Sequence, residues 1–232
     1  TALTNANIGS GAIGESAFNG CTSLTNVTLG NGVTSIGTSA FLKCTRLPSI
    51  TIGSGVASIG KNAFNGCTVL TEAVIQSGTI GEGAFNGCTS LTNVTLGNGV
   101  TSIGRNAFLK CTELTSMDIG SSVKTIESYA FSGCKALEGV TISAAEIGNQ
   151  AFRGASALKK VTLGEGVETI PAGAFSNCGM GNKNNSPELY LKAGTWTSNE
   201  QKTIVAEGAS ITTGDHVFNQ IKSGKAATWS AT

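Results

Sequence analysis

Cysteine is the residue type in this sequence whose number and spacing could support chemistry. There are seven cysteines, and six of them follow a phenylalanine by three residues: Cys21, Cys44, Cys67, Cys88, Cys111 and Cys134. The seventh, Cys178, keeps the same offset, and Ala155 takes the cysteine position in one copy. Thiols at such regular spacing could form disulfides or bind a metal ion.

The cysteines recur at regular intervals because the sequence is repetitive, and the distance between cysteines of stacked repeats distinguishes these alternatives. Equivalent positions in neighbouring layers lie ~4.8 Å apart, with side chains that point the same way. A disulfide instead needs Cβ atoms about 3.8 Å apart that face each other. Because Ala155 takes the same position, a small apolar core residue suits it. The sequence therefore favours buried free thiols over disulfides, and both over a metal site.

Histidine occurs once, at His216, which excludes a His-based catalytic triad and a site with several histidine ligands. Its position favours an exposed residue at the start of a short helix. The sequence contains no Cys-x-x-Cys, no His-Glu-x-x-His, no Walker loop and no dinucleotide-binding glycine set. We therefore expect no enzyme activity, no catalytic residue, no cofactor and no metal site.

The elements that carry these cysteines are copies of one repeated unit. Segment 17–37 returns residue for residue at 84–104, and looser copies fill most of the chain. Each copy is marked by an Ala-Phe pair, with Phe18, Phe41, Phe64, Phe85, Phe108, Phe131, Phe152 and Phe175. Their spacings of 23, 23, 21, 23, 23, 21 and 23 residues give a second period of 67 residues. The copies are expected to stack, because one copy does not enclose its own apolar residues.

Within each unit the apolar pattern predicts a strand followed by two turns. Leu24, Val27 and Leu29 form an apolar set that recurs in later copies, and its alternation with polar residues is typical of a half-buried strand. Glycine and asparagine at 30–32 predict a turn, since both tolerate positive φ. A tight helical turn over 38–44 is expected to return the chain to the next layer.

The motif Ile-Gly-x-x-Ala-Phe-x-x-Cys-x-x-Leu-x-x-Val-x-Leu at 13–29 and 80–96 resembles the BspA-like, or Treponema-type, leucine-rich repeat family. The resemblance covers roughly residues 3–191, with Glu127 and Pro171 where glycine follows isoleucine and Ala155 where cysteine is expected. It implies an α/β, β-rich solenoid, a right-handed leucine-rich repeat stack. A parallel sheet would line one side, with short strands and turns on the opposite side.

The repeat register breaks after Cys178, which predicts two parts. Residues 1–191 are expected to form the solenoid, with about eight units of 21–23 residues, and residues 192–232 a C-terminal capping segment. Ser198 and Gln201 resemble a capping box that starts a helix running to 208, and Asp215 would start a second short helix. The cap would cover the apolar edge of the last repeat.

Composition limits the classes of partner. The net charge is +1 and only 12% of residues are charged, so there is no electrostatic footprint for nucleic acid or an anionic membrane. No apolar run approaches the ~20 residues that cross a bilayer, so membrane insertion is not expected. Thr1 already lies within a repeat, and we expect that a signal peptide and earlier repeats have been removed.

Polar strand positions are expected to form two columns along the sheet, which are the candidate binding surface. The first column is Asn7, Thr28, Thr51, Val74, Thr95, Asp118, Thr141, Thr162 and Tyr190. The second column is Asn5, Asn26, Ser49, Glu72, Asn93, Ser116, Gly139 and Lys160. Charge gathers in the later copies, so the predicted binding residues are Asp118, Thr141, Lys160, Thr162 and Tyr190.

The family resemblance implies a non-enzymatic binding scaffold, secreted or held at the cell surface, that adheres to host matrix proteins or other cells. The residues themselves indicate only a long, polar and nearly uncharged surface. Two alternatives stay open: a structural spacer or stalk that carries another domain, and an accessory module that binds glycans or peptides. A protein partner is thus expected, with a glycan as the alternative ligand.

Overall fold

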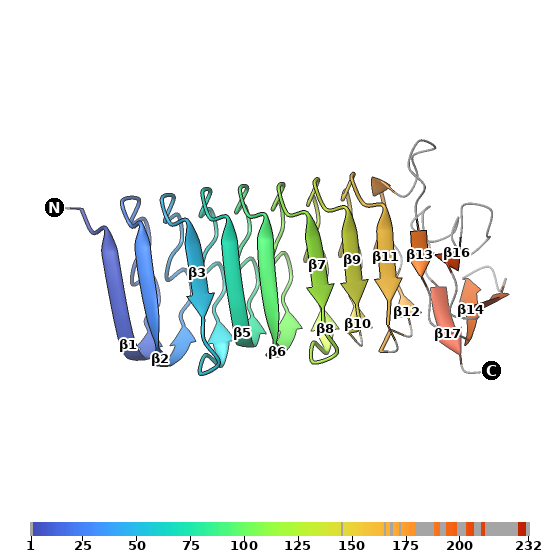
Figure 1. Ribbon diagram of the computed structural model, residues 1–232, viewed down its shortest axis with the longest axis horizontal. Helices are drawn as coiled ribbons and strands as arrows, with labels where there is room; N and C mark the ends of the chain where they lie inside the picture. The colour runs from blue at the N-terminus through green and yellow to red at the C-terminus, as the bar shows by residue number, and fades with distance from the viewer. Residues whose placement is uncertain are drawn as a thin grey trace.

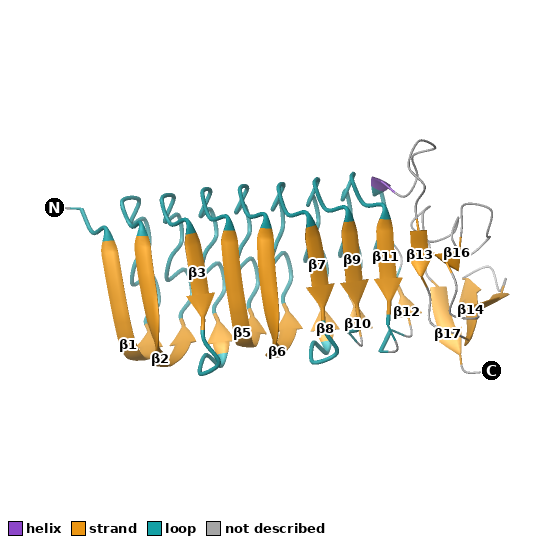
Figure 2. Cartoon of the chain, in the orientation of Figure 1, coloured by secondary structure: helices purple, strands orange, loops and turns teal. Residues whose placement is uncertain are grey.

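The computed structural model describes residues 2–144, 146–164, 166–167, 169–171 and 173–179, together with strands at 188–190, 194–198, 203–206, 210–211 and 227–230. The chain winds into an elongated stack in which each turn adds a layer (Figure 1). Strands and turns account for nearly all described residues, with almost no helix (Figure 2). The predicted leucine-rich repeat solenoid is confirmed. None of the helix present in this described part has the length and apolarity that a bilayer crossing requires.

Long strands build one wall of the stack and two-residue strands run along its lower edge. The long strands are β1 (Asn5–Ile13), β2 (Asn26–Ile36), β3 (Ser49–Ile52), β5 (Glu72–Ile80), β6 (Asn93–Ile103), β7 (Ser116–Ile119), β9 (Gly139–Ile142) and β11 (Lys160–Leu163). The short strands are β4 (Ser58–Ile59), β8 (Thr125–Ile126), β10 (Glu146–Ile147) and β12 (Thr169–Ile170). Strands from different layers of this part of the stack pair in parallel. We call the outward surface of the long strands the sheet face.

Rows of identical side chains fill the core, as the repeat period predicts. The eight phenylalanine rings from Phe18 to Phe175 stack with centroids 5.0–5.2 Å apart and nearly parallel planes. The thiols form a second row, in which Cys88 Sγ donates a hydrogen bond to the Phe64 carbonyl oxygen at 3.2 Å. Offset ring stacking and shared apolar burial bind each layer to its neighbours.

The helical turn predicted over 38–44 is wrong. Leu42 N–H does bond to the Ser39 carbonyl three residues back, but Phe41 N–H donates to Ala63 in the next layer. A helix does not continue because Ser39 and Lys43 have φ values of +55° and +58°, in the left-handed region. The segment is a series of turns whose alternate amides join the layers.

The turn predicted over 30–32 is also wrong. β2 and its copy β6 run unbroken through Gly-Asn-Gly, and register shifts against β1 and β5 absorb the extra residues of the longer unit. Glycine is required there because a Cβ on Gly32 would lie 2.6 Å from the Cβ of Ser10. In the next layer, residues 54–55 do form a turn between β3 and β4.

The ladder of the sheet face is interrupted beside each of these bulged strands. β2 pairs with β1 and β4, and β6 with β5 and β8, whereas β3 pairs with β5 and β7 with β9. Among the described strands, no pairing joins β2 to β3 or β6 to β7. Leu29 and Leu96 are half-buried at these breaks, while the equivalent Ile52 and Ile119 are fully buried.

The C-terminal strands change the direction of pairing. β13 (Glu188–Tyr190) adds in parallel to β11, and β16 (Ser210–Ile211) then pairs antiparallel with β13. β17 (Ala227–Ser230) pairs antiparallel with both β12 and β14 (Gly194–Ser198). Antiparallel strands at the end of both ladders agree with a cap, although the boundary at residue 191 stays a prediction.

The helix predicted from Ser198 to Gly208 is wrong. β14 ends at Ser198, and β15 (Thr203–Ala206) pairs with it as an antiparallel strand in which Trp196 lies opposite Ile204. The β-branched residues on both strands favour extended backbone over the local capping signal. The second predicted helix, from Asp215, lies outside the described residues together with His216.

Candidate binding surface

Within each uninterrupted section of the ladder, the strand register confirms the two polar columns predicted from the sequence. In the first column, Thr51, Val74 and Thr95 are aligned across β3, β5 and β6. In the later layers Thr141 lies between Asp118 and Thr162, and Tyr190 is next to Thr162 in register. The second column aligns in the same way. The sheet face therefore presents hydroxyl and amide groups in regular rows.

Four of the five predicted binding residues line one hollow on the sheet face. The hollow, of about 320 Å³, is lined by Ser116, Met117, Asp118, Gly139, Val140, Thr141, Lys160 and Thr162. It exists because Gly139 has no side chain in a column where Ser116 and Lys160 have one. The nearest atom to a Cβ placed on Gly139 would be 3.9 Å away. Sequence reasoning placed Gly139 in the column without noticing that its missing side chain leaves a hollow.

A second hollow adjoins the first at the break between β6 and β7. It measures about 290 Å³ and is lined by Val94, Thr95, Leu96, Asn98, Ser116, Asp118 and Gly120. Ser116 and Asp118 belong to both hollows. The half-buried Leu96 contributes apolar surface to the second hollow, although the sequence pattern assigned it to the core. Nothing in the sequence signals this site, because it depends on the interrupted ladder.

Asp118 stands at the shared wall of the two hollows. Its side chain is exposed, and within the described part of the chain it makes no hydrogen bond or ion pair. Two other carboxylates near the sheet face do have partners: Glu138 pairs with Lys159 at 3.2 Å, and Glu72 accepts a hydrogen bond from Asn93. The structure thus places an unpartnered negative charge beside an apolar surface and several hydroxyl groups.

Comparison with known proteins identifies the repeat. The family model described as the BspA type leucine rich repeat region matches residues 1–79 and 76–182, in six copies. The chain belongs to the BspA-type leucine-rich repeat family.

Solved structures agree with this assignment to the BspA-type family. A leucine-rich repeat protein of T. pallidum is 34% identical, with a TM-score of 0.58, over 63% of this chain and 71% of that protein. A leucine-rich repeat protein of Bacteroides ovatus is 27% identical, with a TM-score of 0.55, over 71% of this chain. The match spans only 50% of the Bacteroides protein. No curated protein shows significant similarity to the chain.

A BspA-type leucine-rich repeat protein is typically a binding scaffold without enzymatic activity, and leucine-rich repeat proteins generally bind other proteins.

The buried cysteines of this chain are poorly suited to chemistry. Burial raises the pKa of Cys88 and of Cys134 to about 12, and that of Cys44 to about 11, the last with an added contribution from Cys21. Such thiols are protonated at neutral pH and are poor nucleophiles and metal ligands. Among the described residues no group of three His, Cys, Asp or Glu side chains could hold a metal ion.

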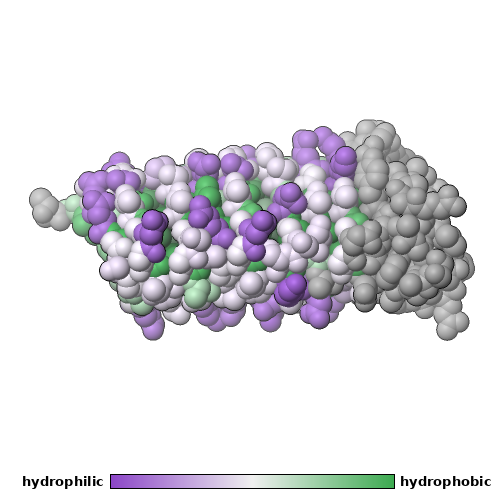
Figure 3. Space-filling model, turned by 60° about the horizontal axis from the view of Figure 1, so that its bottom comes forward, coloured by the Kyte–Doolittle hydropathy of each residue, from purple (hydrophilic) through white to green (hydrophobic). Residues whose placement is uncertain are grey.

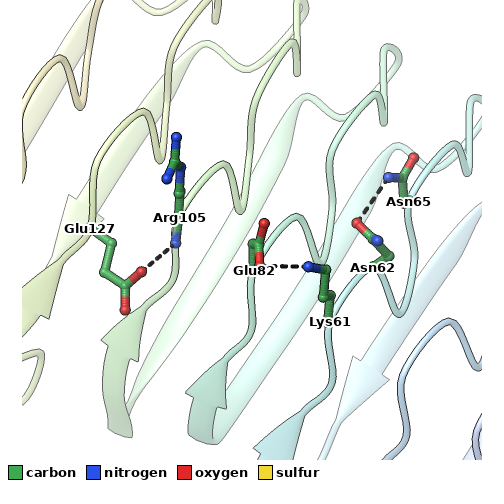
Figure 4. A network of polar contacts seen from close by, with 6 residues as sticks. All are labelled: Lys61, Asn62, Asn65, Glu82, Arg105 and Glu127. Carbon is green, nitrogen blue, oxygen red and sulfur yellow. Dashed lines mark hydrogen bonds and ion pairs between the residues drawn. The ribbon is translucent and has the colours of Figure 1, made fainter.

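The turn side of this BspA-type stack carries its own polar contacts, which Figure 4 shows. Lys61 Nζ lies 2.8 Å from Glu82 Oε2, and this hydrogen bond and charge lower the pKa of the Glu82 carboxyl. Glu127, at a position where most copies have glycine, accepts a hydrogen bond from the backbone N–H of Arg105 at 2.9 Å. The ion pair joins charged side chains of two layers, and Glu127 accepts from a backbone amide of the layer before it, so both contacts serve the stack.

Proposed function

We propose that this chain is the protein-binding part of a secreted or surface-held protein that adheres to host matrix proteins or to other cells. The observation that carries the proposal is the pair of adjoining hollows on the sheet face, with Asp118 between them and without a partner among the described residues. Parallel ladders on both sides of the break, and the stacked core beneath them, hold this surface in place, so little conformational entropy is lost when a partner binds.

The chemistry of the sheet face indicates binding through many small contacts. Its described outward side chains are mainly Thr, Asn and Ser, with polar residues spread between small apolar areas (Figure 3). Of tryptophan, tyrosine and arginine, which dominate interface hot spots, the two columns contain only Tyr190, at their C-terminal end. A partner would therefore need to cover several layers, since stable interfaces bury about 800 Å² on each protein. With a single aromatic ring in the two columns, the glycan-binding alternative is disfavoured as well.

The proposal is tested by the binding of the purified chain to immobilised fibronectin, fibrinogen, laminin and collagen, measured by biolayer interferometry. One variant places three lysines on the sheet face through Thr95→Lys, Asp118→Lys and Thr141→Lys. A control variant with the same charge change carries Thr68→Lys, Thr89→Lys and Glu113→Lys in the turns that precede the strands. We expect the wild-type chain and the control variant to bind at least one of these proteins, and the sheet-face variant to bind it at least about tenfold more weakly.

Equal binding by the wild-type chain, the sheet-face variant and the control variant would contradict the assignment of the sheet face as the binding surface. Absence of binding to every matrix protein would leave the spacer as the better proposal, because a spacer tolerates changes on every surface. The melting temperatures of the three proteins, followed by circular dichroism, confirm that a loss of binding does not come from a loss of folding.

A further inference from the structure

We infer that Asp118 receives the cationic side chain of an arginine or lysine in an extended segment of a protein partner. The inference rests on the proposed function, because it takes the partner to be a protein that contacts the sheet face. It names a single anchor within that surface. The segment would lie across the sheet face and place its cationic side chain over the break between β6 and β7.

The first support is the electrostatic state of Asp118. Its carboxylate is exposed, and no described residue of the chain donates a hydrogen bond to it. In register it lies opposite Thr141, a neutral residue, and the position that matches it in β6 is Thr95. A guanidinium group could therefore form two parallel hydrogen bonds with this carboxylate without displacing an internal partner. A carboxylate so placed accepts a cation more readily than Glu82 or Glu138, which already have lysine partners.

The second support is the shape and lining of the hollow at the ladder break. Leu96 is half-buried there and lies on the same wall as Val94, while Asn98 and Ser116 supply polar groups around the rim. Arginine and lysine have apolar stems that pack on apolar surface while the charged end stays among polar groups. The hollow thus offers an apolar surface for the stem and a carboxylate for the charge.

Charge also decides which of the two hollows takes the cation. Lys160 lines the hollow around Gly139 but not the hollow at the ladder break. The lining of the β6–β7 side of Asp118 contains no basic residue, so no cationic side chain of that lining competes for the carboxylate there. The cationic side chain is therefore assigned to the β6–β7 side.

The chain contains a natural counterpart of this site, one 67-residue block earlier. The lining residues Val94, Leu96, Asn98, Ser116 and Gly120 have identical equivalents in Val27, Leu29, Asn31, Ser49 and Gly53. The ladder is interrupted there as well, between β2 and β3. Thr51 takes the place of Asp118. The two breaks therefore differ in the residue on which the inference depends, and each can be converted into the other by one substitution.

The test uses two synthetic peptides, acetyl-Thr-Gly-Thr-Arg-Thr-Gly-Thr-amide and the same peptide with citrulline in place of arginine. Citrulline keeps the shape of arginine and removes its charge. Binding to the full chain is measured by NMR titration of the ¹⁵N-labelled protein at low salt. We expect the arginine peptide to bind about tenfold more tightly than the citrulline peptide, which is the effect of one charge-assisted contact. Its largest shift changes should fall on residues around Asp118.

Two variants decide whether the preference belongs to Asp118. Asp118→Thr, which copies the earlier block, should remove the preference for arginine, and Thr51→Asp should create a second site that fills with similar affinity. Glu113→Thr, an exposed acid in a turn, is the control for net charge and should keep the preference. A preference that survives Asp118→Thr, or that Glu113→Thr removes equally, overturns the inference, and so does an absence of any second site in Thr51→Asp.

These outcomes are separate from the test of the proposed function. If the wild-type chain binds no matrix protein but prefers the arginine peptide through Asp118, the anchor stands and matrix adhesion fails. If it binds a matrix protein equally well with Asp118→Thr, adhesion stands and this anchor is overturned. Both substitutions exchange exposed polar residues that the chain itself uses at this position, so folding is expected to be retained.

Discussion

The two copies of segment 17–37 have the same residues and different surroundings. Phe85 stacks between Phe64 and Phe108 and is fully buried, whereas Phe18 stacks on Phe41 alone and stays partly exposed. Cys88 is buried in the same way, and its copy Cys21 is only half-buried. In a stacked repeat, the contribution of a residue to the free energy of unfolding thus depends on the layers on either side of it. Substitutions at matched positions of the two copies measure that effect directly.

The largest difference is expected between Phe85→Ala and Phe18→Ala. Phe85→Ala should lower the free energy of unfolding by about 3–5 kcal/mol, because it leaves a cavity and removes two ring contacts. Phe18→Ala should cost about half as much, since its ring has one stacking neighbour and is partly in water. Urea unfolding followed by circular dichroism gives both values, and equal losses would contradict the dependence on neighbours.

A smaller difference is expected between Gly81→Ala and Gly14→Ala, which change the same position of the unit. A Cβ on Gly81 would lie 2.5 Å from the Ile59 carbonyl oxygen, so its backbone has to move. Gly81→Ala should therefore destabilise the chain by about 1–3 kcal/mol. A Cβ on Gly14 meets nothing within 4 Å, and Gly14→Ala should change stability by less than about 0.5 kcal/mol. Thermal unfolding of the two variants checks the order.

The buried thiols should make the stack sensitive to alkaline pH. Burial raises the pKa of Cys88 from its ordinary value of 9.0 to about 12. The stabilisation from the protonated thiol is complete below pH 9 and is lost as the pH rises toward 12, because the unfolded chain ionises first. Each such thiol contributes a slope of about −1.4 kcal/mol per pH unit in that window. Unfolding free energies at pH 8, 9 and 10 should therefore fall less steeply for Cys88→Ala than for Cys21→Ala, and identical slopes would contradict the prediction.

The smallest effect on stability is expected at a pair of turn-side positions that differ between the first 67-residue block and the second. Lys61 and Glu82 form an ion pair in the first block, and Ser128 and Asn149 stand at these positions in the second. Both charged side chains are about half exposed, so Lys61→Ser should change the unfolding free energy by less than about 1 kcal/mol. The loss should shrink further in 1 M NaCl. A larger and salt-independent loss would mean that the lysine stem supports packing between the layers.

Most of the core could be predicted from the sequence. The phenylalanine, leucine and cysteine rows follow from residue spacing alone, because copies in register must place equal residues one above another. The polar columns were predicted for the same reason, and with them Asp118, Thr141, Lys160 and Thr162 as neighbours on one surface.

Predictions of local backbone structure were less accurate. The turn over 30–32, the helical turn over 38–44 and the helix from Ser198 failed because backbone contacts between layers, or between strands, outweigh local preference.

The sequence by itself determined the architecture, the buried thiols and the polar face, since each is a property of the period. Only the tertiary structure decided where that period is broken. Hydrogen-bonded pairing is missing between β6 and β7, because β6 continues as a bulged strand where the next unit forms a turn. This difference in backbone path can be seen only when the two layers are placed side by side. The hollow at that break and the exposed side of Leu96 both follow from this mismatch between layers.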